Sequence, residues 1–310
     1  MISDSGRLIL AFDVGGTQIK AAVMRGGAII EQSMGQYEAK SYLAADASIA
    51  HFVAIVRDIL QRGGLDSEPI DGFGLAFPGP FDYGKGICLI RGLGKFESLY
   101  GLHVGKLLEE ALHADAALRA RLTPQFHIAF ENDAALFGLG EASGFNAGED
   151  LRAVCLTVGT GLGSCFLENG KLVKHRPDVP ENGWLYKTPY RYGIADEYVS
   201  KIGVLRLAMD RGVDIRDRDV RQLADAAFAG SLPEKELFEA FGEQMAVILG
   251  PALRRFAPDV IVIGGQISKS GSLFAPSFQA GLASQGLKAQ VRISRDTFAS
   301  TFRGIYDLVQ

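Results

Sequence analysis

The chain has 310 residues, of which 47% are hydrophobic and 22% charged, values typical of a folded globular protein rather than a disordered one. The formal net charge of −4 gives no basic footprint of the kind that nucleic-acid-binding proteins carry, so a nucleic-acid partner is not expected. The 38 glycines are about 12% of the chain, against a usual ~7%. They occur in short clusters beside apolar runs, which predicts sharp turns or backbone that approaches a ligand closely.

The cysteines and the apolar runs indicate where the protein works. Cys88, Cys155 and Cys165 lie in apolar, strand-like sequence without a Cys-x-x-Cys pair, which favours buried thiols in a reducing compartment. The first residues do not resemble a secretory leader, and no apolar run approaches the ~18 residues of a membrane span. A cytoplasmic protein without a membrane partner is therefore predicted.

The first half of the chain begins with three short apolar runs separated by glycine turns, which predicts three consecutive antiparallel strands. Helical and strand-like periods then alternate, and a loop-rich stretch at 81–101 interrupts them. Strands are predicted at 8–14, 19–24, 28–31, 70–77 and 127–130, and helices at 43–60 and 134–139.

The same order of strand, glycine turn, strand, glycine turn and strand returns about 145 residues later. Such a duplication predicts two similar α/β domains that face each other across a cleft. We expect one domain at 1–132, completed by a C-terminal helix at about 297–310, and the other at 133–296. The second half adds strands at 153–158, 164–168, 171–173 and 260–263, and helices at 197–209, 220–229 and 232–256.

Residues 13–20, Asp-Val-Gly-Gly-Thr-Gln-Ile-Lys, cover the first predicted turn. Gly15 and Gly16 leave the backbone amides open to a phosphate, while Thr17 adds a hydroxyl donor and Lys20 a positive charge. Asp13, at the strand end, is a candidate to hold Mg²⁺ directly or through water. A Gly-Gly-Thr segment between strands is more often only a turn. However, Gly159-Thr160-Gly161-Leu-Gly163 in the equivalent turn of the second domain favours a pair of phosphate-binding turns.

Five motifs in order resemble the ROK family, which comprises repressors, open-reading-frame proteins and sugar kinases within the actin and hexokinase superfamily. The resemblance covers about residues 7–305 and implies two ribonuclease H-like, actin-like ATPase domains. The motifs are residues 13–20, Phe-Pro-Gly-Pro at 77–80, Asn-Asp at 132–133, the glycine turn at 159–163, and Ile-Val-Ile-Gly-Gly at 261–265.

The resemblance implies an ATP- and Mg²⁺-dependent kinase. Asp133 would accept the proton of the attacking sugar hydroxyl, as phosphoryl transfer requires, although Asn132-Asp133 also fits a plain helix cap. Asn132 and Gly79 would contact the sugar, and Gly264 and Gly265 would let the adenine and ribose lie against the backbone. Homodimerisation is a further expectation from the family.

The sugar-binding segment departs from the family pattern. Kinases of the family usually carry Glu-x-Gly-His followed by a cysteine cluster that binds zinc, whereas this chain has Glu181-Asn-Gly-Trp184 and none of those cysteines. No structural zinc is expected, and His175 fits an ordinary loop histidine. Glu181 can still accept hydrogen bonds from sugar hydroxyls, Trp184 can stack on a sugar or cover the altered loop, and Asp196, or its neighbour Glu197, takes the place of the second family glutamate.

The leading prediction is a kinase that phosphorylates a glucose-like hexose, most simply at C6, with polyphosphate as an alternative donor to ATP. A sugar-responsive repressor is the second prediction. Such repressors carry a helix-turn-helix before the first phosphate motif, and only twelve residues precede Asp13 here, which favours the kinase. A non-catalytic sugar-binding relative is the third prediction.

Overall fold

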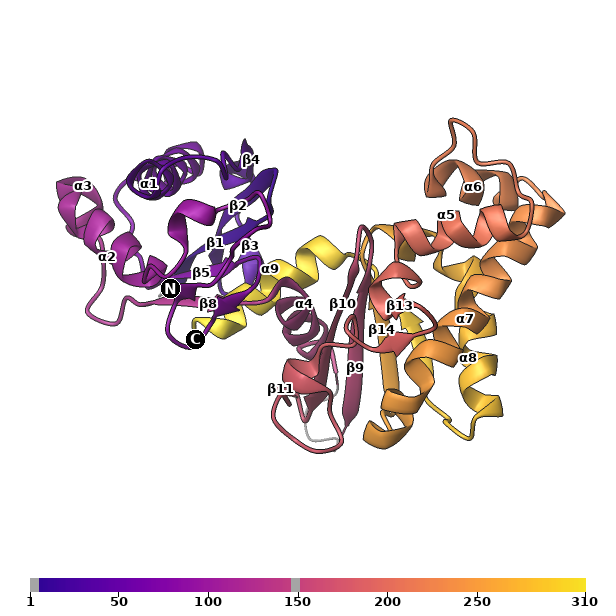
Figure 1. Ribbon diagram of the computed structural model, residues 1–310. Coiled ribbons are helices and arrows are strands. Elements are labelled where there is room, and N and C mark those ends of the chain that lie inside the picture. Colours follow the sequence, from indigo (N-terminus) through magenta and orange to yellow (C-terminus); the bar gives the residue numbers. More distant parts are fainter. Residues whose placement is uncertain (1–5, 146–150) are drawn as a thin grey trace. The chain divides into compact units, whose positions relative to one another are not determined.

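The computed structural model describes residues 6–145 and 151–310, which divide into two compact units (Figure 1). Met1–Leu136 and Ala299–Gln310 form one unit, and Phe137–Phe298 forms the other. The division falls inside helix α4 (Asp133–Ala142) and near the start of the C-terminal helix α9 (Thr297–Leu308). Each unit therefore has its own sheet and its own core.

The first unit is built on a sheet of strand order β3-β2-β1-β5-β8, with β4 paired to β2. The pairs β3-β2, β2-β1 and β2-β4 are antiparallel, whereas β1-β5 and β5-β8 are parallel. The strands are β1 (Leu8–Val14), β2 (Gln18–Arg25), β3 (Ala28–Ile29), β4 (Gly35–Glu38), β5 (Gly72–Ala76) and β8 (Ile128–Glu131). A small separate hairpin pairs β6 (Phe81–Asp82) with β7 (Ile87–Cys88).

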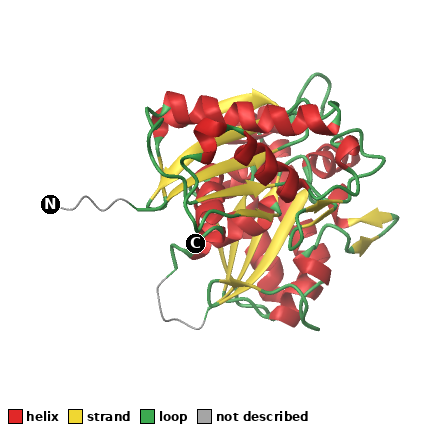
Figure 2. Ribbon diagram, turned by 90° about the vertical axis from the view of Figure 1, so that its left-hand side faces the viewer, coloured by secondary structure: helices red, strands yellow, loops and turns green. Residues whose placement is uncertain are grey.

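Helices cover this sheet because its strands carry apolar residues on both faces (Figure 2). One face packs on α1 (Ala45–Arg62), where the ring of Phe52 lies 6.4 Å from that of Phe12. The other face meets α9, and β5 has glycine at 72 and 74 because a Cβ there would collide with Val309 and Ile305. Helices α2 (Val104–Ala114) and α3 (Ala116–Arg119) complete the unit.

The second unit repeats the plan. Its sheet has the order β11-β10-β9-β14-β15, again antiparallel over the first three strands and parallel over the last two. The strands are β9 (Arg152–Val158), β10 (Leu162–Glu168), β11 (Lys171–Leu172), β14 (Val260–Gly264) and β15 (Gln290–Ile293). A hairpin pairs β12 (Pro189–Tyr190) with β13 (Gly193–Ile194).

Four helices enclose the core of this unit: α5 (Lys201–Asp210), α6 (Val220–Phe228), α7 (Leu232–Phe256) and α8 (Gly271–Ser284). Helix α6 begins with a capping box, in which Asp219 and Gln222 satisfy each other's backbone N–H groups. From α7, Phe256 packs edge-on against Phe166 of β10, with 4.9 Å between the ring centroids. Aromatic packing thus ties the longest helix to the sheet.

The duplicated three-strand pattern predicted from the sequence is confirmed, but the helix predicted at 197–209 begins later. Residues Ala195–Glu197 form a separate 3-10 turn, and the extended backbone of Ser200 precedes α5. Strands β4, β6, β7, β12, β13 and β15 and helices α2, α3 and α8 were not predicted. Helix α8 was not predicted because Pro276 lies inside it and small residues interrupt the helical spacing of its apolar residues.

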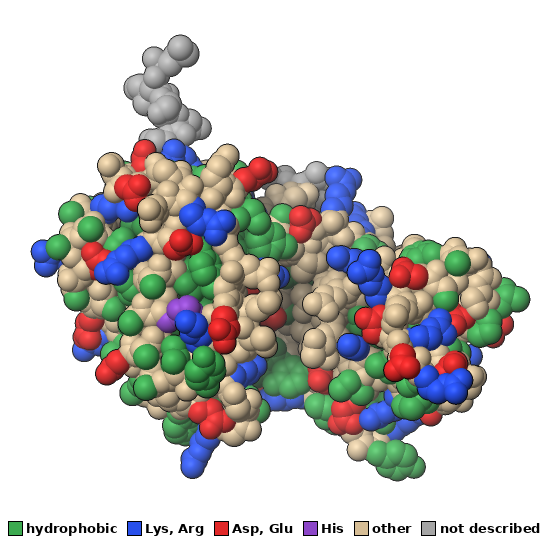
Figure 3. Space-filling view, turned by 90° about the horizontal axis from the view of Figure 1, so that it is seen from above, with side chains coloured by type: hydrophobic (Ala, Val, Ile, Leu, Met, Phe, Trp, Pro, Cys, Tyr) green, Lys and Arg blue, Asp and Glu red, His purple; other side chains and the backbone are tan. Residues whose placement is uncertain are grey.

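The distribution of charged side chains on the surface agrees with the small net charge of the chain. On the face drawn in Figure 3, Lys and Arg side chains are interspersed with Asp and Glu rather than gathered into one basic area. Within the described ranges, no helix combines the length and the apolar character needed to cross a membrane.

Candidate functional site

The first glycine turn joins β1 to β2 and is fixed from both sides. Gly15 donates its N–H to the carbonyl of Gln18 at 2.9 Å, so the turn closes on the strand pair. The carbonyls of Gly16 and Thr17 accept hydrogen bonds from the Ser41 hydroxyl and the Ala39 N–H. No described residue accepts a hydrogen bond from the N–H of Gly16 or Thr17. These two donors remain available to an anion.

Three parallel strands end beside one another in the first unit and bring the predicted polar residues to one sheet edge. Asp13 of β1 pairs with Ala76 of β5, and Ala76 pairs with Glu131 of β8. Gly79 follows β5, and Asp133 begins α4 directly after β8. The carboxyl ends of parallel strands are where open α/β sheets bind ligands.

Asn132 and Asp133 form the start of α4. The Ala134 N–H donates to Asn132 Oδ1 at 3.0 Å and to Asp133 Oδ1 at 2.8 Å. The cap interpretation of this pair is therefore correct. It does not remove the second interpretation, because solvent still reaches Asp133.

The pKa values of both carboxyl groups at this edge are raised, and that of Asp13 depends in part on Asp133. Loss of solvation raises the pKa of Asp13; Lys20, whose Nζ lies 3.8 Å from Asp13 Oδ2, lowers it; and the negative charge of Asp133 raises it again. Loss of solvation also raises the pKa of Asp133, against the lowering effects of the Ala134 N–H and of Lys95. Asp13, Lys20 and Asp133 thus belong to one electrostatic site, and a fourth charged residue, Lys95, belongs to it too.

The second unit places its glycines at the equivalent strand ends. Gly159 N–H donates to the carbonyl of Gly161 at 3.0 Å in the turn between β9 and β10. Gly264 ends β14 and pairs with Thr157 of β9. Gly265 has a φ of 92° and lies so close to Val158 that a Cβ would come within 2.5 Å of its carbonyl oxygen, which explains the glycine. Thr160 is exposed in the turn, whereas Gly163 lies one residue inside β10.

Asp196 supports this turn directly. Its Oδ1 accepts a hydrogen bond from the Leu162 N–H at 2.7 Å, and a Cβ at Gly161 would lie 2.8 Å from the same oxygen. Glu197 instead lies near Arg206, with 3.8 Å between Oε2 and Nη1. The sequence pattern assigned Asp196 to the sugar, and the carboxylate's observed contact is with the glycine turn.

The segment from Glu181 to Trp184 is fastened to β10 by a buried serine. Ser164 donates to the carbonyl of Gly183 at 2.7 Å and accepts from the Leu185 N–H at 2.8 Å. Glu181 is exposed, and Trp184 is half-buried beside Tyr186, with 5.9 Å between the ring centroids. Lys187 Nζ lies 5.0 Å from the centre of the Trp184 ring.

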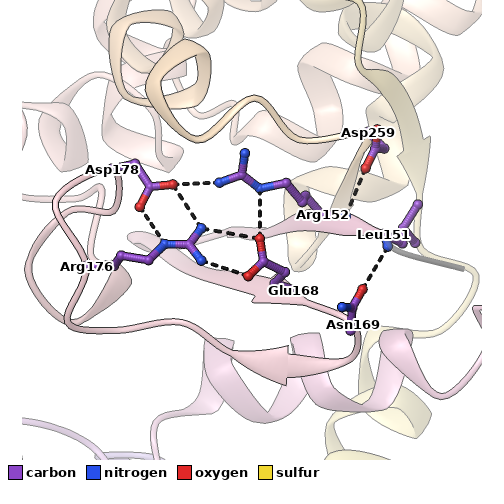
Figure 4. A network of polar contacts seen from close by, with 7 residues as sticks. All are labelled: Leu151, Arg152, Glu168, Asn169, Arg176, Asp178 and Asp259. Atoms are coloured by element: carbon purple, nitrogen blue, oxygen red, sulfur yellow. Dashed lines mark hydrogen bonds and ion pairs between the residues drawn. The ribbon is translucent and has the colours of Figure 1, made fainter.

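Charged residues order the loop that leads to Glu181 (Figure 4). Arg152 of β9 and Arg176 of the loop both donate to Asp178 at 2.6 Å, and Arg176 also donates to Glu168 of β10 at 2.7 Å. Hydrogen bonds from Arg176 lower the pKa of Glu168 and of Asp178. The loop is thereby held on the sheet.

Sequence reasoning missed two side chains at these sites, Lys95 and Ser164, and one contact of a predicted residue, Asp196. Lys95 and Ser164 had no motif, and the contact of Asp196 with the turn depends on residues more than thirty positions apart in the chain. Among the described residues, no group of three or more His, Cys, Asp or Glu side chains could hold a metal ion.

Two α/β units that share one sheet order, each with a glycine turn after its first strand, define the actin-like ATPase fold. A model of the ROK family matches residues 9–300. The chain belongs to the ROK family, as a variant without the family's zinc-binding cysteine motif.

Two relatives have related sequences. An uncharacterised protein of Clostridium perfringens is 25% identical over 301 residues, which are 94% of this chain and 92% of that protein. The N-acetyl-D-glucosamine kinase of Haemophilus influenzae is 21% identical over 282 residues, 84% of this chain and 85% of the kinase.

Three solved structures have the same fold. A glucokinase from Parabacteroides distasonis superposes with a TM-score of 0.79 at 21% identity, over 100% of this chain and 99% of its own. A ROK glucokinase from Streptomyces griseus, in complex with glucose and AMPPNP, gives 0.67 at 21%, over 97% and 98%. A ROK transcriptional regulator, a homolog of the Escherichia coli MLC protein, gives 0.77 at 15%, over 99% of this chain and 79% of its own.

Proposed function

We propose that this protein is a sugar kinase that transfers the γ-phosphate of ATP to a hydroxyl of a glucose-like hexose. The observation that carries the proposal is that Asp13 lies close enough to Asp133 for the charge of Asp133 to raise its pKa, at the sheet edge that also presents the free amides of Gly16 and Thr17. Phosphoryl transfer needs such a set: donors for the phosphate, a carboxylate for the metal and a second carboxylate for the hydroxyl proton.

Asp133 is the proposed general base. Its raised pKa makes it a better proton acceptor than an ordinary aspartate, and its exposure lets a substrate reach it. In the proposed step the hydroxyl oxygen forms a bond to the γ-phosphorus, the bond from that phosphorus to the ADP oxygen breaks, and Asp133 takes the hydroxyl proton. Asn132 lies beside Asp133, and both side chains accept from the Ala134 N–H, which would help to hold the carboxylate in position.

Asp13 fits a magnesium ligand. Mg²⁺ usually keeps several waters and takes one or two protein carboxylates together with substrate phosphates. Asp13 is a partly exposed carboxylate whose charge is disfavoured by lost solvation and by Asp133, and a cation would relieve both effects. The ion would neutralise negative charge on the phosphate oxygens. Within the second unit, the glycines of the turn at 159–161 and at 264–265 are the proposed contacts of the nucleotide, with Gly163 and Thr160 beside them.

Glu181, Trp184, Asn132 and Gly79 are the proposed sugar contacts, with C6 as the proposed acceptor position. Trp184 supplies an aromatic face for the sugar's C–H groups where the family pattern has histidine. Asp196 would act on the sugar only through the turn that it holds, unless it turns away from Leu162.

The test is turnover of a hexose panel with Mg-ATP by the wild-type protein, Asp133→Asn and Asp133→Ala. We expect the wild type to phosphorylate at least one sugar. Both variants should lose at least about 100-fold in kcat, because a positioned general base contributes that much or more. Nucleotide binding should remain. The matched control is Asp66→Asn, an exposed aspartate of the same unit.

A wild-type protein that phosphorylates no sugar would refute the kinase. Sugar binding without turnover would instead favour a sugar-responsive regulator or a non-catalytic relative, since the family includes a regulator of the same fold.

A further inference from the structure

The chain segment around Lys95 is fixed at its C-terminal side by a buried aromatic residue. Phe96 has a left-handed backbone, with a φ of 51°, and its N–H donates to the carbonyl of Ser41 at 2.7 Å. Its ring lies 5.4 Å from that of Phe77 and 6.3 Å from that of Phe52. A non-glycine residue adopts this conformation at a cost, which the buried ring and the hydrogen bond offset. The backbone at Lys95 is therefore held in place.

The Lys95 side chain lies over the first glycine turn. A Cβ built on Gly16 would come 3.0 Å from Lys95 Cδ, so the missing side chain at Gly16 makes room for the lysine's methylene groups. Ser41 joins the two segments, because its carbonyl accepts from Phe96 and its hydroxyl donates to the carbonyl of Gly16 at 2.8 Å. The missing side chain at Gly16 therefore leaves space for the Lys95 side chain and also leaves the backbone N–H open to a phosphate.

The positive charge of Lys95 acts on Asp133. It lowers the pKa of that carboxyl, just as Lys20 lowers the pKa of Asp13. Lys95 is half-buried, and it forms no ion pair within 4.0 Å with any residue in the described part of the chain. Lys20 thus lowers the pKa of Asp13 and Lys95 that of Asp133, and no carboxylate of the described residues forms a close ion pair with Lys95.

We infer that Lys95 is a catalytic residue whose ammonium binds the oxygens of the transferred γ-phosphoryl group between the Gly16 turn and Asp133. This inference rests on the proposed function. As the bond to ADP breaks and the bond to the sugar oxygen forms, negative charge spreads over the equatorial phosphoryl oxygens, and a fixed ammonium stabilises that charge. The lysine keeps its proton throughout the step. It also favours the ionised form of the base that must accept the hydroxyl proton.

The test compares Lys95→Met, which keeps the length of the side chain without its charge, with Lys95→Arg. The matched control is Lys106→Met, an exposed lysine of the same unit that pairs with Glu110. We expect Lys95→Met to lower kcat about 100-fold, the loss typical of removing one group that stabilises transition-state charge, with little change in the sugar KM. Lys95→Arg should recover part of the rate.

Calorimetric binding of AMPPNP and of ADP gives a second readout that needs no turnover. A lysine that contacts the γ-phosphoryl group should strengthen AMPPNP binding and leave ADP binding nearly unchanged, so Lys95→Met should lose AMPPNP affinity selectively. A merely structural role would weaken both ligands together, and circular dichroism would show whether the variant has folded.

The outcomes separate this inference from the proposed function. Equal kcat in Lys95→Met and wild type, or equal loss of AMPPNP and ADP binding, would overturn the role of Lys95. Sugar turnover by the wild type would still support the proposed kinase function. Absence of sugar turnover would overturn the kinase, and a selective AMPPNP loss would still support a γ-phosphoryl contact. A wild type that binds neither nucleotide would overturn both.

Discussion

Gly304 has no Cβ, and this lets α9 come close to the start of α4. A Cβ at this position of α9 would lie 1.8 Å from the backbone carbonyl oxygen of Leu136 in α4. Neighbouring residues of α9, among them Phe302, Ile305 and Tyr306, are buried. The approach therefore decides whether the C-terminal helix docks.

We predict that Gly304→Ala destabilises the protein, although alanine is normally the better helix former by about 1 kcal/mol. The new methyl group meets backbone, which cannot turn aside as a side chain can, so the loss should reach about 3 kcal/mol, the upper part of the range for overpacking. Urea unfolding measures it. Gly250→Ala in α7 is the control, because its Cβ would meet the movable end of Gln285. Equal stability of Gly304→Ala and wild type would contradict the prediction.

At the residue scale, the sequence revealed the groups that belong to a local pattern. Asp13 lies near the end of β1, just before Gly15 and Gly16 in the turn, and Asp133 comes two residues after the last residue of β8. Lys95 stands between two exposed glycines and a phenylalanine, and only the packing of Phe96 and the contact with Gly16 give it a role. Ser164 was invisible for the same reason, since its partners lie about twenty residues away.

At the scale of the element, the loop between β11 and Glu181 depends on charge. Arg152, Arg176, Glu168 and Asp178 contact one another, and the guanidinium of Arg152 also lies 4.3 Å from the centre of the Phe256 ring. Because Arg176 and its neighbours lower the pKa of Asp178 and Glu168, both carboxylates stabilise the fold above the pKa of the unfolded chain. That contribution is lost as the pH falls through the lower folded value.

We therefore predict that Asp178→Asn is less stable than wild type at pH 7 and that the difference shrinks as the pH falls below the ordinary aspartate pKa of 3.8. The effect should be modest, because these groups are near solvent and salt screens them. Unfolding by urea at several pH values and two salt concentrations measures it, with Asp225→Asn on α6 as the control. A difference that does not depend on pH would mean that the side chain acts by packing rather than by charge.

The sequence predicted helices and strands best where a regular spacing of apolar residues continued over a long segment and clear turn residues bounded it. The strands at β1 and β9 and the helix at α7 follow their patterns, because apolar residues there repeat regularly between glycine or serine boundaries. The helix predicted at 197–209 begins only at Lys201, because the residues around Asp196 and Tyr198 do not continue it. Their backbone instead follows tertiary contacts, since Asp196 bonds to Leu162 and Tyr198 packs on Tyr190.

At the scale of the whole molecule, two sheets of identical order mean that each half places its glycine turn at the same point of its own sheet. The two halves differ in the residues that lie at this edge of the sheet. The first adds Asp13, Asp133 and two lysines, whereas the second adds Gly264 and Gly265 and the segment around Trp184. The duplication could be predicted from the sequence because the turns repeat, whereas the proposed division of binding roles between the halves rests on the family motifs.

The segment at 184–198 lies where the resemblance to the family led us to expect no structural zinc. The segment is held by the Ser164 hydrogen bonds, by the β12-β13 hairpin, and by the packing of Tyr190 against Tyr198, with 4.9 Å between the ring centroids. The guanidinium of Arg206 lies 5.0 Å from the centre of the Tyr198 ring. These contacts need no metal. Because a structural zinc contributes its binding energy to folding, a protein that lacks it should not respond to a chelator.

We predict that the purified protein carries far less than one zinc per chain and that its Tm is the same with and without a strong zinc chelator. Elemental analysis and thermal unfolding in the same buffer measure the two quantities, and added zinc serves as the reverse control, which should not raise the Tm. Tyr198→Ala should lower the Tm, because it removes the ring that joins Tyr190 to Arg206. One tightly bound zinc per chain, with a Tm that falls on chelation, would contradict the prediction and would mean that a metal rather than these aromatic contacts holds the segment beside Trp184.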